Sequence, residues 1–218
     1  MDQRTDEQLF EAYRRGDRNA IRTLIERYHE DLLRFLVRLV GERAGAEDVF
    51  QETFLQIHQA SETFDATRRF RPWLFTIAAN KGRDYLRRKV RRRALDLSAP
   101  VGGGSGGGDG GPQYVDLMEV RVPTPGAAMD AEEQSRIVQG ILDQMPLALR
   151  EILLLSYFQR LSYAQIAEDL EIPLGTVKSR LHAAVATFAK RWNAEQNLST
   201  DRPTDAPSNN SPPKDLSA

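Results

Sequence analysis

Four polar side chains close to the C-terminal end of the sequence carry hydrogen-bond donors that suit a nucleic acid. They are Lys178, Ser179, Arg180 and His182. Val177, Leu181 and Ala184 alternate with them at helical spacing, so the sequence predicts a helix with its donors on one face. Donors on an exposed helix can reach base edges and phosphates in a major groove. The alternative is a surface helix pair with ordinary charges, because short helix pairs are common.

A shorter helix is predicted just before this one. Ser162 is expected to be its N-cap, because its hydroxyl can accept from a free backbone N–H of the first turn. Ile166 and Leu170 form its apolar side, and Pro173 is expected to end it. Thr176 is then expected to cap the following helix. The two helices together predict a helix-turn-helix, a motif whose second helix enters the major groove of DNA.

A second set of cations occupies residues 68–93, which hold 11 Lys or Arg residues and Asp84 as the only acidic residue. Pro72 suits the first turn of a helix there. Aromatic side chains beside a basic stripe suit single-stranded nucleic acid, with cations for the phosphates and π-faces for the bases. The alternative is that the basic side chains form an ordinary solvated helix face and that Trp73 and Tyr85 are simply core residues. The density of charge favours nucleic-acid contact; the basic side carries Asn80, Lys81, Arg83, Arg87, Arg88 and Arg91.

The remaining composition excludes several classes of protein. The whole chain of 218 residues has a net charge of −1, so acidic segments surround the basic one, which argues against indiscriminate nucleic-acid binding. It contains no cysteine, which excludes disulfides and thiolate metal sites and suits the cytoplasm. No apolar run has the length of a membrane span, and the first residues do not resemble a secretory signal. His29, His58 and His182 lack the spacing of metal ligands, so we expect no metal, no cofactor and no enzyme.

Apolar residues recur with a helical period in both halves of the chain, and no alternating strand pattern is present. The sequence therefore predicts an all-α fold of two small helical bundles. Residues 1–93 are predicted to form the first bundle and residues 130–193 the second, which holds the helix-turn-helix. Residues 94–129 contain the run VGGGSGGGDGGPQ and are predicted to be a flexible linker. Residues 194–218 are polar and proline-rich, and we expect them to be disordered.

Helix ends are well marked in the first bundle. Thr5 and Gln8 predict a capping box, Asp17 is expected to cap the next helix, and Gly16 and Gly41 are expected to end helices. A further amphipathic helix is predicted over residues 46–59. Its outward side is a solvated face by periodicity alone, and a docking face for a larger partner is the alternative. That side carries Asp48, Gln51, Glu52 and Leu55.

Three segments together resemble a known family. In chain order they read AEDVFQETFLQIH, FRPWLFTIAANKGRDYLRR and LSYAQIAEDLEIPLGTVKSRLHAA. In this order, with a linker before the third, they resemble the extracytoplasmic-function (ECF) sigma factors of the sigma-70 family. The resemblance covers Leu9–Arg93 and about Ala131–Trp192. It implies a subunit of bacterial RNA polymerase that binds the core enzyme, recognises the −35 and −10 promoter elements and promotes DNA opening in the cytoplasm.

The resemblance also implies which residues carry these steps. The clamp helices of core RNA polymerase would be bound by Asp48, Gln51, Glu52 and Leu55. A second set of residues would recognise and melt the −10 element, with an unstacked base held in the loop 65–71. This set is Asp65, Arg68, Arg69, Arg71, Trp73, Asn80, Lys81, Asp84, Arg87 and Arg88. The −35 element would be read as duplex by Thr176, Lys178, Ser179, Arg180 and His182.

Two positions depart from the family pattern. Glu171 stands in the turn where the family often has glycine, and Ala183 stands where a basic residue is frequent, so we expect weak −35 binding by the second bundle alone. An anti-sigma factor is a common partner in the family, although no residue here identifies one. The alternative function is a stand-alone helix-turn-helix transcriptional regulator. It predicts a dimerisation helix that the sequence does not show, and it leaves the basic helix at 72–93 without a role.

Overall fold

The protein is described from a computed structural model, which describes residues 2–65, 68–96, 131–159 and 162–200. Within these ranges all regular secondary structure is helical, as the sequence predicted. Nearly all of the predicted linker and the last part of the predicted tail lie outside the described residues. The flexibility expected for them therefore stays a prediction.

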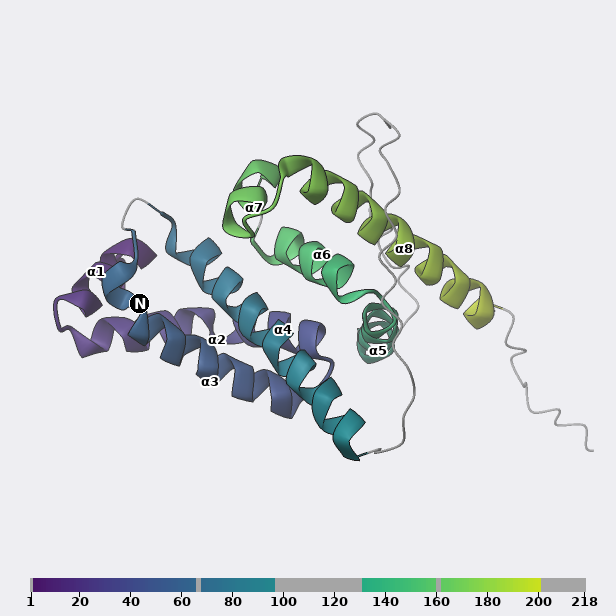
Figure 1. The fold of residues 1–218 in the computed structure, drawn as a ribbon, viewed down its shortest axis with the longest axis horizontal. Helices are drawn as coiled ribbons and strands as arrows, with labels where there is room; N and C mark the ends of the chain where they lie inside the picture. Colours follow the sequence, from purple (N-terminus) through teal and green to yellow (C-terminus); the bar gives the residue numbers. More distant parts are fainter. Residues whose placement is uncertain (1, 66–67, 97–130, 160–161, 201–218) are drawn as a thin grey trace, which may run out of the picture.

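The first bundle is formed by four α-helices and a short 3₁₀ turn. They are α1 (Asp6–Arg14), α2 (Arg18–Val40), α3 (Arg43–Gln59), η1 (Ser61–Thr63) and α4 (Phe70–Asp96). Helix α2 packs against α1, α3 and α4, and α4 crosses α3 (Figure 1). The predicted bundle is therefore confirmed, and α4 is the long helix on which most of the basic segment lies.

The predicted caps at Thr5 and Asp17 and the predicted helix ends at Gly16 and Gly41 are confirmed, but α3 begins at Arg43 rather than at residue 46, and α4 continues to Asp96, beyond the predicted end of the bundle at residue 93. The Thr5 hydroxyl accepts from the Gln8 N–H while the Gln8 side chain accepts from the Thr5 N–H, which completes a capping box. The Asp17 side chain accepts from the Asn19 N–H and caps α2. Gly41 ends α2 with φ +87°, a left-handed conformation that glycine adopts without strain. These local signals are enough to place the helices because each satisfies backbone groups that the helix itself cannot.

An aromatic cluster fixes the beginning of α4. The Phe64 ring lies 4.5 Å from the Trp73 ring and 5.0 Å from the Phe10 ring, measured between centroids, and Phe70 packs 5.0 Å from Phe10. Phe64 and Phe70 are buried and Trp73 is half-buried. The loop between α3 and α4 is thus held at both ends by aromatic contacts, which positions the polar residues between them.

The second bundle is formed by α5 (Ala131–Asp143), α6 (Leu147–Gln159), α7 (Tyr163–Asp169) and α8 (Leu174–Thr200). Helix α8 packs against the other three. Ser162 caps α7 in a capping box with Gln165, as predicted for Ser162. Val177, Leu181 and Ala184 are buried, as their spacing indicated.

Three predicted boundaries in this bundle are wrong. Helix α7 ends at Asp169, before Pro173, because the chain turns at Glu171 with φ +52°. Thr176 is not an N-cap: the Pro173 carbonyl accepts from the N–H of Thr176 at 2.9 Å, so α8 begins at Leu174 and Thr176 lies in its first turn. Helix α8 continues to Thr200, beyond the predicted end at residue 193, because the next residues, Ala, Glu and Gln, favour helix.

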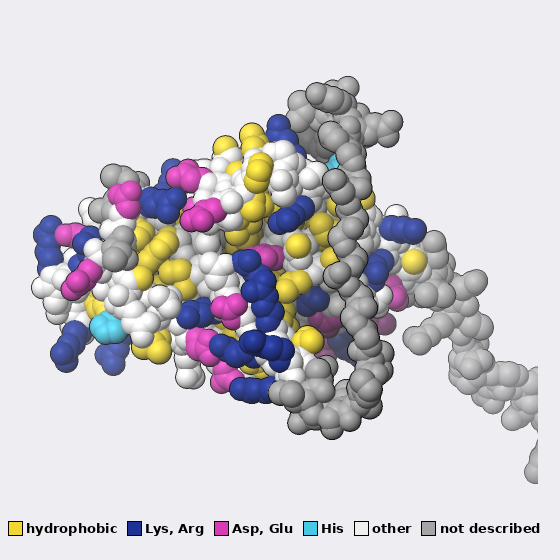
Figure 2. Space-filling model, in the orientation of Figure 1, with side chains coloured by type: hydrophobic (Ala, Val, Ile, Leu, Met, Phe, Trp, Pro, Cys, Tyr) yellow, Lys and Arg dark blue, Asp and Glu magenta, His cyan; other side chains and the backbone are white. Residues whose placement is uncertain are grey.

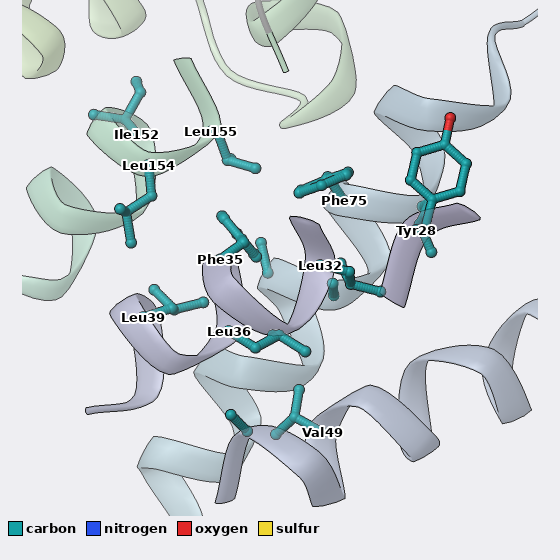
Figure 3. Close-up of a cluster of buried hydrophobic side chains, with 14 of the residues drawn as sticks. Tyr28, Leu32, Phe35, Leu36, Leu39, Val49, Phe75, Ile152, Leu154 and Leu155 are labelled. Carbon is teal, nitrogen blue, oxygen red and sulfur yellow. The ribbon is translucent and has the colours of Figure 1, made fainter. Parts of the chain in front are cut away.

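The two bundles pack against each other, with α6 lying on α2 and α4 (Figure 1). Figure 3 shows Phe35 and Phe75 of the first bundle pointing toward Leu155 of the second. The Phe158 ring lies 5.7 Å from Phe35 and 6.4 Å from Phe75 between centroids. The buried residues of both bundles therefore form one continuous core.

Candidate functional site

The donors predicted to read duplex DNA lie together on the first turns of α8. Lys178, Ser179, Arg180 and His182 are exposed, while the intervening apolar residues are buried. Thr176 is half-buried, and its carbonyl accepts from the Ser179 hydroxyl at 3.2 Å. The beginning of α8 thus presents two cations, an imidazole and a hydroxyl to solvent, which is the donor set that phosphates and base edges accept from.

The residues predicted to contact the −10 element on α4 divide between two faces of that helix. Trp73, Asn80, Asp84 and Arg87 follow one another at helical spacing along one side. Asn80, Asp84 and Arg87 are exposed, and Trp73 is half-buried at the end nearest the loop. This side combines an aromatic ring with polar and cationic groups, as a single strand requires.

Lys81 and Arg88 lie on the side of α4 that faces α3. The Lys81 ammonium donates to the Gln56 side chain at 3.0 Å, and the Arg88 guanidinium pairs with Glu52 at 3.0 Å. Both side chains are half-buried. The structure therefore places Arg88 beside the residues predicted for polymerase docking rather than beside Asn80.

The loop before α4 carries the remaining predicted −10 residues. Asp65, Arg68 and Arg69 are exposed, and the Arg68 N–H donates to the Asp65 carbonyl at 3.0 Å. Arg71 is half-buried, since it lies over the rings of Tyr28 and Phe75. The loop thus presents two exposed cations and a carboxylate next to the aromatic cluster, while Arg71 packs against the interior.

Several of these cations also contact the second bundle. Arg71 donates to the Phe158 carbonyl at 2.8 Å, and Arg68 pairs with Glu168 at 3.3 Å. On α4, Arg83 pairs with Glu151 at 3.0 Å. Glu151 is 7% exposed, and its pKa is raised overall, because the effect of burial exceeds the opposite effect of the neighbouring Arg83. In this arrangement the second bundle therefore covers part of the predicted −10 surface.

The predicted docking residues form one wall of a groove between α3 and α4. Asp48, Gln51 and Leu55 are exposed, and Leu55 is 56% exposed. The groove has a volume of about 790 Å³. An exposed leucine among acidic and amide groups suits a partner that offers both apolar and basic side chains.

The opposite wall of this groove was missed by the sequence reasoning. Tyr85, Lys89 and Arg92 line it together with Arg88. The Tyr85 hydroxyl donates to Glu42 at 2.7 Å, and this hydrogen bond raises the tyrosine pKa. Positions 85, 88 and 92 recur at helical spacing, so their shared face was visible in the sequence, but the helix that it faces was not.

Charge is distributed unevenly over the surface. Figure 2 shows Lys and Arg side chains gathered over the C-terminal half of α4, with acidic side chains beside them. Among the described residues, no group of three His, Asp or Glu side chains is arranged to hold a metal ion. Within the same residues, no helix has both the length and the apolar character needed to cross a bilayer.

Comparisons with known proteins place both bundles in one family. Residues 24–92 match Sigma-70 region 2, and residues 135–188 match Sigma-70 region 4. The chain is 31% identical to the ECF RNA polymerase sigma factor SigW of Bacillus subtilis over 178 residues, covering 82% of this chain and 91% of SigW. It is 32% identical over 185 residues to the RNA polymerase sigma-H factor of Pseudomonas aeruginosa, covering 84% and 92%.

Two solved structures share the fold. One is CnrH in complex with the cytosolic domain of CnrY, with a TM-score of 0.60 and 24% identity, covering 87% of this chain and 98% of that one. The other is the sigma factor RpoE in complex with the anti-sigma factor NepR from Bartonella quintana, with a TM-score of 0.56 and 21% identity, covering 84% and 98%.

Proposed function

The chain belongs to the ECF RNA polymerase sigma factors of the sigma-70 family, and on that premise we propose a role for each of its exposed surfaces. It is a sigma factor, a transcription initiation subunit, and the stand-alone regulator is not favoured by the comparisons. The proposal therefore concerns which residues bind polymerase and which read each promoter element.

The groove between α3 and α4 docks on the clamp helices of core RNA polymerase. Leu55 is the apolar anchor, and Asp48, Gln51 and Glu52 supply acceptors around it. Burying an exposed leucine contributes about 1.5–3 kcal/mol, which is large enough for one residue to affect complex formation measurably. The Glu52–Arg88 pair positions one of these acceptors.

DNA is contacted by two separate surfaces. The beginning of α8, with Thr176, Lys178, Ser179, Arg180 and His182, reads the −35 element as duplex, because only a major groove displays a distinct pattern for each base pair. The loop 65–71 and the Asn80 face of α4 read the −10 element and hold its unpaired strand, which lowers the cost of melting. Lys81 and Arg88 support that face from the α3 side. The observation that carries this proposal is the exposed row of Asn80, Asp84 and Arg87 leading to Trp73.

We also propose that this chain acts in the cytoplasm and that an anti-sigma factor binds it. Of the two solved structures with this fold, the RpoE structure contains the anti-sigma factor NepR, and the CnrH structure contains the cytosolic domain of CnrY. The test is co-purification of one protein with this chain from its native host, followed by loss of initiation when that protein is added to a reconstituted reaction. Undiminished initiation would contradict the proposal.

Reconstitution tests the function itself. The purified chain is mixed with bacterial core RNA polymerase, and co-elution and start sites on genomic fragments are measured. We expect co-elution and new start sites, and we expect Leu55→Ala to weaken co-elution by about tenfold or more. Val90→Ala is the matched control, because Val90 is also exposed but lies outside the groove. Equal loss in both variants would contradict the docking assignment, and absence of co-elution would contradict the sigma-factor role.

A further inference from the structure

Arg83 has no part in the function proposed above, yet it is held more closely than an ordinary surface cation. Its side chain is 33% exposed. Its Nε atom is buried and, within the described ranges, has no hydrogen-bond partner. Leaving a buried donor unpaired costs free energy, so stability alone does not account for an arginine at this position.

One nitrogen of Arg83 joins two other residues. Its Nη2 atom donates to the Asn80 side-chain oxygen and to Glu151 Oε1, the latter at 3.0 Å. Asn80 and Arg83 are three residues apart on α4, a spacing that brings two side chains together on a helix. Glu151 belongs to the second bundle, whereas the contact with Asn80 is internal to α4. The Asn80 contact therefore does not depend on the packing of the two bundles.

This contact fixes the orientation of the Asn80 amide. A guanidinium carries donors and no acceptor, so only the oxygen of the amide can face it. The amide nitrogen, with its two hydrogens, is then directed away from Arg83. Asn80 is exposed, and no residue in the described part of the chain accepts from this nitrogen. Helix α4 thus presents a donor of fixed orientation to solvent.

A donor of fixed orientation distinguishes bases by one exocyclic group. T and G carry a keto oxygen, an acceptor, where C and A carry an amino group, a donor. An amide that rotates freely can offer either its oxygen or its nitrogen to a base, so it discriminates poorly between the two classes. An amide whose oxygen is held by a cation can only donate to the base, which favours a keto base over an amino base.

We propose that Arg83 is a positioning residue that makes Asn80 select a keto base, T or G, in the −10 element. Arg83 does this through the Asn80 amide and without touching the base. This inference rests on the proposed function, which assigns Asn80 to the −10 element and gives Arg83 no role.

The test uses reconstituted holoenzyme and a promoter library with a randomised −10 element, in which initiation is measured for each sequence. Asn80→Ala first identifies the position whose base preference depends on Asn80. There we expect the wild type to favour T or G over C or A by about fivefold, the effect of roughly one hydrogen bond. We expect Arg83→Ala to reduce this preference to less than about twofold and to leave the preferences at other positions unchanged.

Two further variants separate positioning from a structural role. A carboxylate only accepts, so Asn80→Asp, with one oxygen held by Arg83 and the other facing the base, should shift the preference toward C or A. Arg83→Ala added to Asn80→Ala should cause no further change in base preference at this position, because Arg83 acts through Asn80. A purely structural role for Arg83 would change initiation on all sequences alike and leave the ratio between bases as in the wild type.

Two controls remove neighbouring charges while keeping the Asn80–Arg83 contact. Arg87→Ala removes an exposed cation one turn further along α4, so total initiation should fall while the preference at this position stays. Glu151→Gln neutralises the other partner of Arg83 and should also keep the preference.

The outcomes distinguish the role of Arg83 from the wider function. A preference that persists in Arg83→Ala, is lost in either control, favours C or A in the wild type, or does not shift in Asn80→Asp would overturn the positioning role and leave Asn80 in the −10 surface. If no position changes its base preference in Asn80→Ala, the −10 assignment of Asn80 is overturned and this inference with it.

Discussion

Glu171 occupies a backbone conformation that side chains rarely adopt. Its φ of +52° lies in the left-handed region, where the Cβ atom crowds the following carbonyl. The turn requires this conformation because α7 ends at Asp169 and α8 begins only a few residues later, at Leu174. The residue type gave no sign of it: glutamate does not predict a left-handed turn, and only the family resemblance drew attention to the position.

Glycine at position 171 should therefore stabilise the protein. Glu171→Gly relieves a strain of about 1 kcal/mol and should raise the thermal midpoint by about 2–4 °C. Ala164→Gly is the control: Ala164 is exposed and lies inside α7, where glycine should cost about 1 kcal/mol and lower the midpoint. Thermal unfolding followed by circular dichroism measures both. A lower midpoint for Glu171→Gly would mean that the glutamate side chain contributes more than its backbone strain costs.

At the scale of elements, the crossing of α3 and α4 depends on one glycine. A Cβ atom added to Gly45 would lie 2.5 Å from the Tyr85 hydroxyl oxygen and 2.6 Å from the ring carbon that carries it. Tyr85 in turn donates to Glu42 and lines the groove between the two helices. The shape of the proposed docking groove is thus linked to the absence of a side chain at position 45.

Gly45→Ala should move Tyr85 and weaken core binding. Overpacking a well-packed contact costs about 1–3 kcal/mol, so we expect a lower unfolding midpoint together with reduced co-elution with core polymerase. Gly140→Ala is the matched control, because an added Cβ there meets no atom within 4 Å and the helical position favours alanine. A Gly45→Ala variant with wild-type stability and co-elution would show that Tyr85 can shift without consequence for the groove.

The elements themselves were predictable to different degrees. Ser162 and Thr5 cap helices in ways that depend only on neighbouring residues, so their sequence positions were sufficient. The start of α8 was misplaced by three residues, because the Pro173 carbonyl accepts the first hydrogen bonds of the helix, whereas the sequence indicated Thr176 as the cap. The family resemblance identified the −10 residues. It did not show that Lys81 and Arg88 face α3 while Asn80 and Arg87 face solvent, because that division depends on how α3 packs against α4.

At the scale of the whole molecule, the packing of the two bundles was not predictable from the sequence. Phe35 and Phe158 belong to different bundles, and each looks like a core residue of its own helix. The buried Arg150 donates to the Leu39 carbonyl at 3.0 Å, a contact between positions that no local pattern connects. Such contacts depend on the complementarity of two folded surfaces, which periodicity does not report.

This packing should depend on pH through Glu151. Burial raises the pKa of Glu151, whereas separated bundles would leave it solvated with an ordinary pKa of about 4.3. Glu151 therefore binds its proton more tightly when the bundles are packed than when they are apart. Packing is favoured as the pH falls toward the ordinary glutamate pKa, and it weakens as the pH rises through the raised pKa of Glu151. Asp169 contributes in the same direction, because burial raises its pKa as well.

The measurement is energy transfer between one dye on each bundle, titrated between about pH 7 and about pH 5. We expect the mean distance between the two dyes to decrease in the wild type as the pH is lowered, and to change much less in Glu151→Gln. Glu133→Gln on the exposed side of α5 is the control and should follow the wild type. Identical titrations for the wild type and Glu151→Gln would exclude this carboxyl as the group responsible.

The central claim is that separate surfaces read the −35 element and open the −10 element. Its most direct test is a pair of footprints on one promoter with holoenzyme: nuclease protection for closed binding and permanganate reactivity for unpaired bases.

Lys178→Ala with Arg180→Ala should lose protection at the −35 element, at a cost of about 1–3 kcal/mol for each base contact removed. Asn80→Ala with Arg87→Ala should keep that protection and lose permanganate reactivity. Arg136→Ala with Lys190→Ala, which removes two exposed charges elsewhere in the second bundle, should behave as wild type. Loss of both footprints in both test variants, or wild-type footprints in either, would contradict the separation of roles.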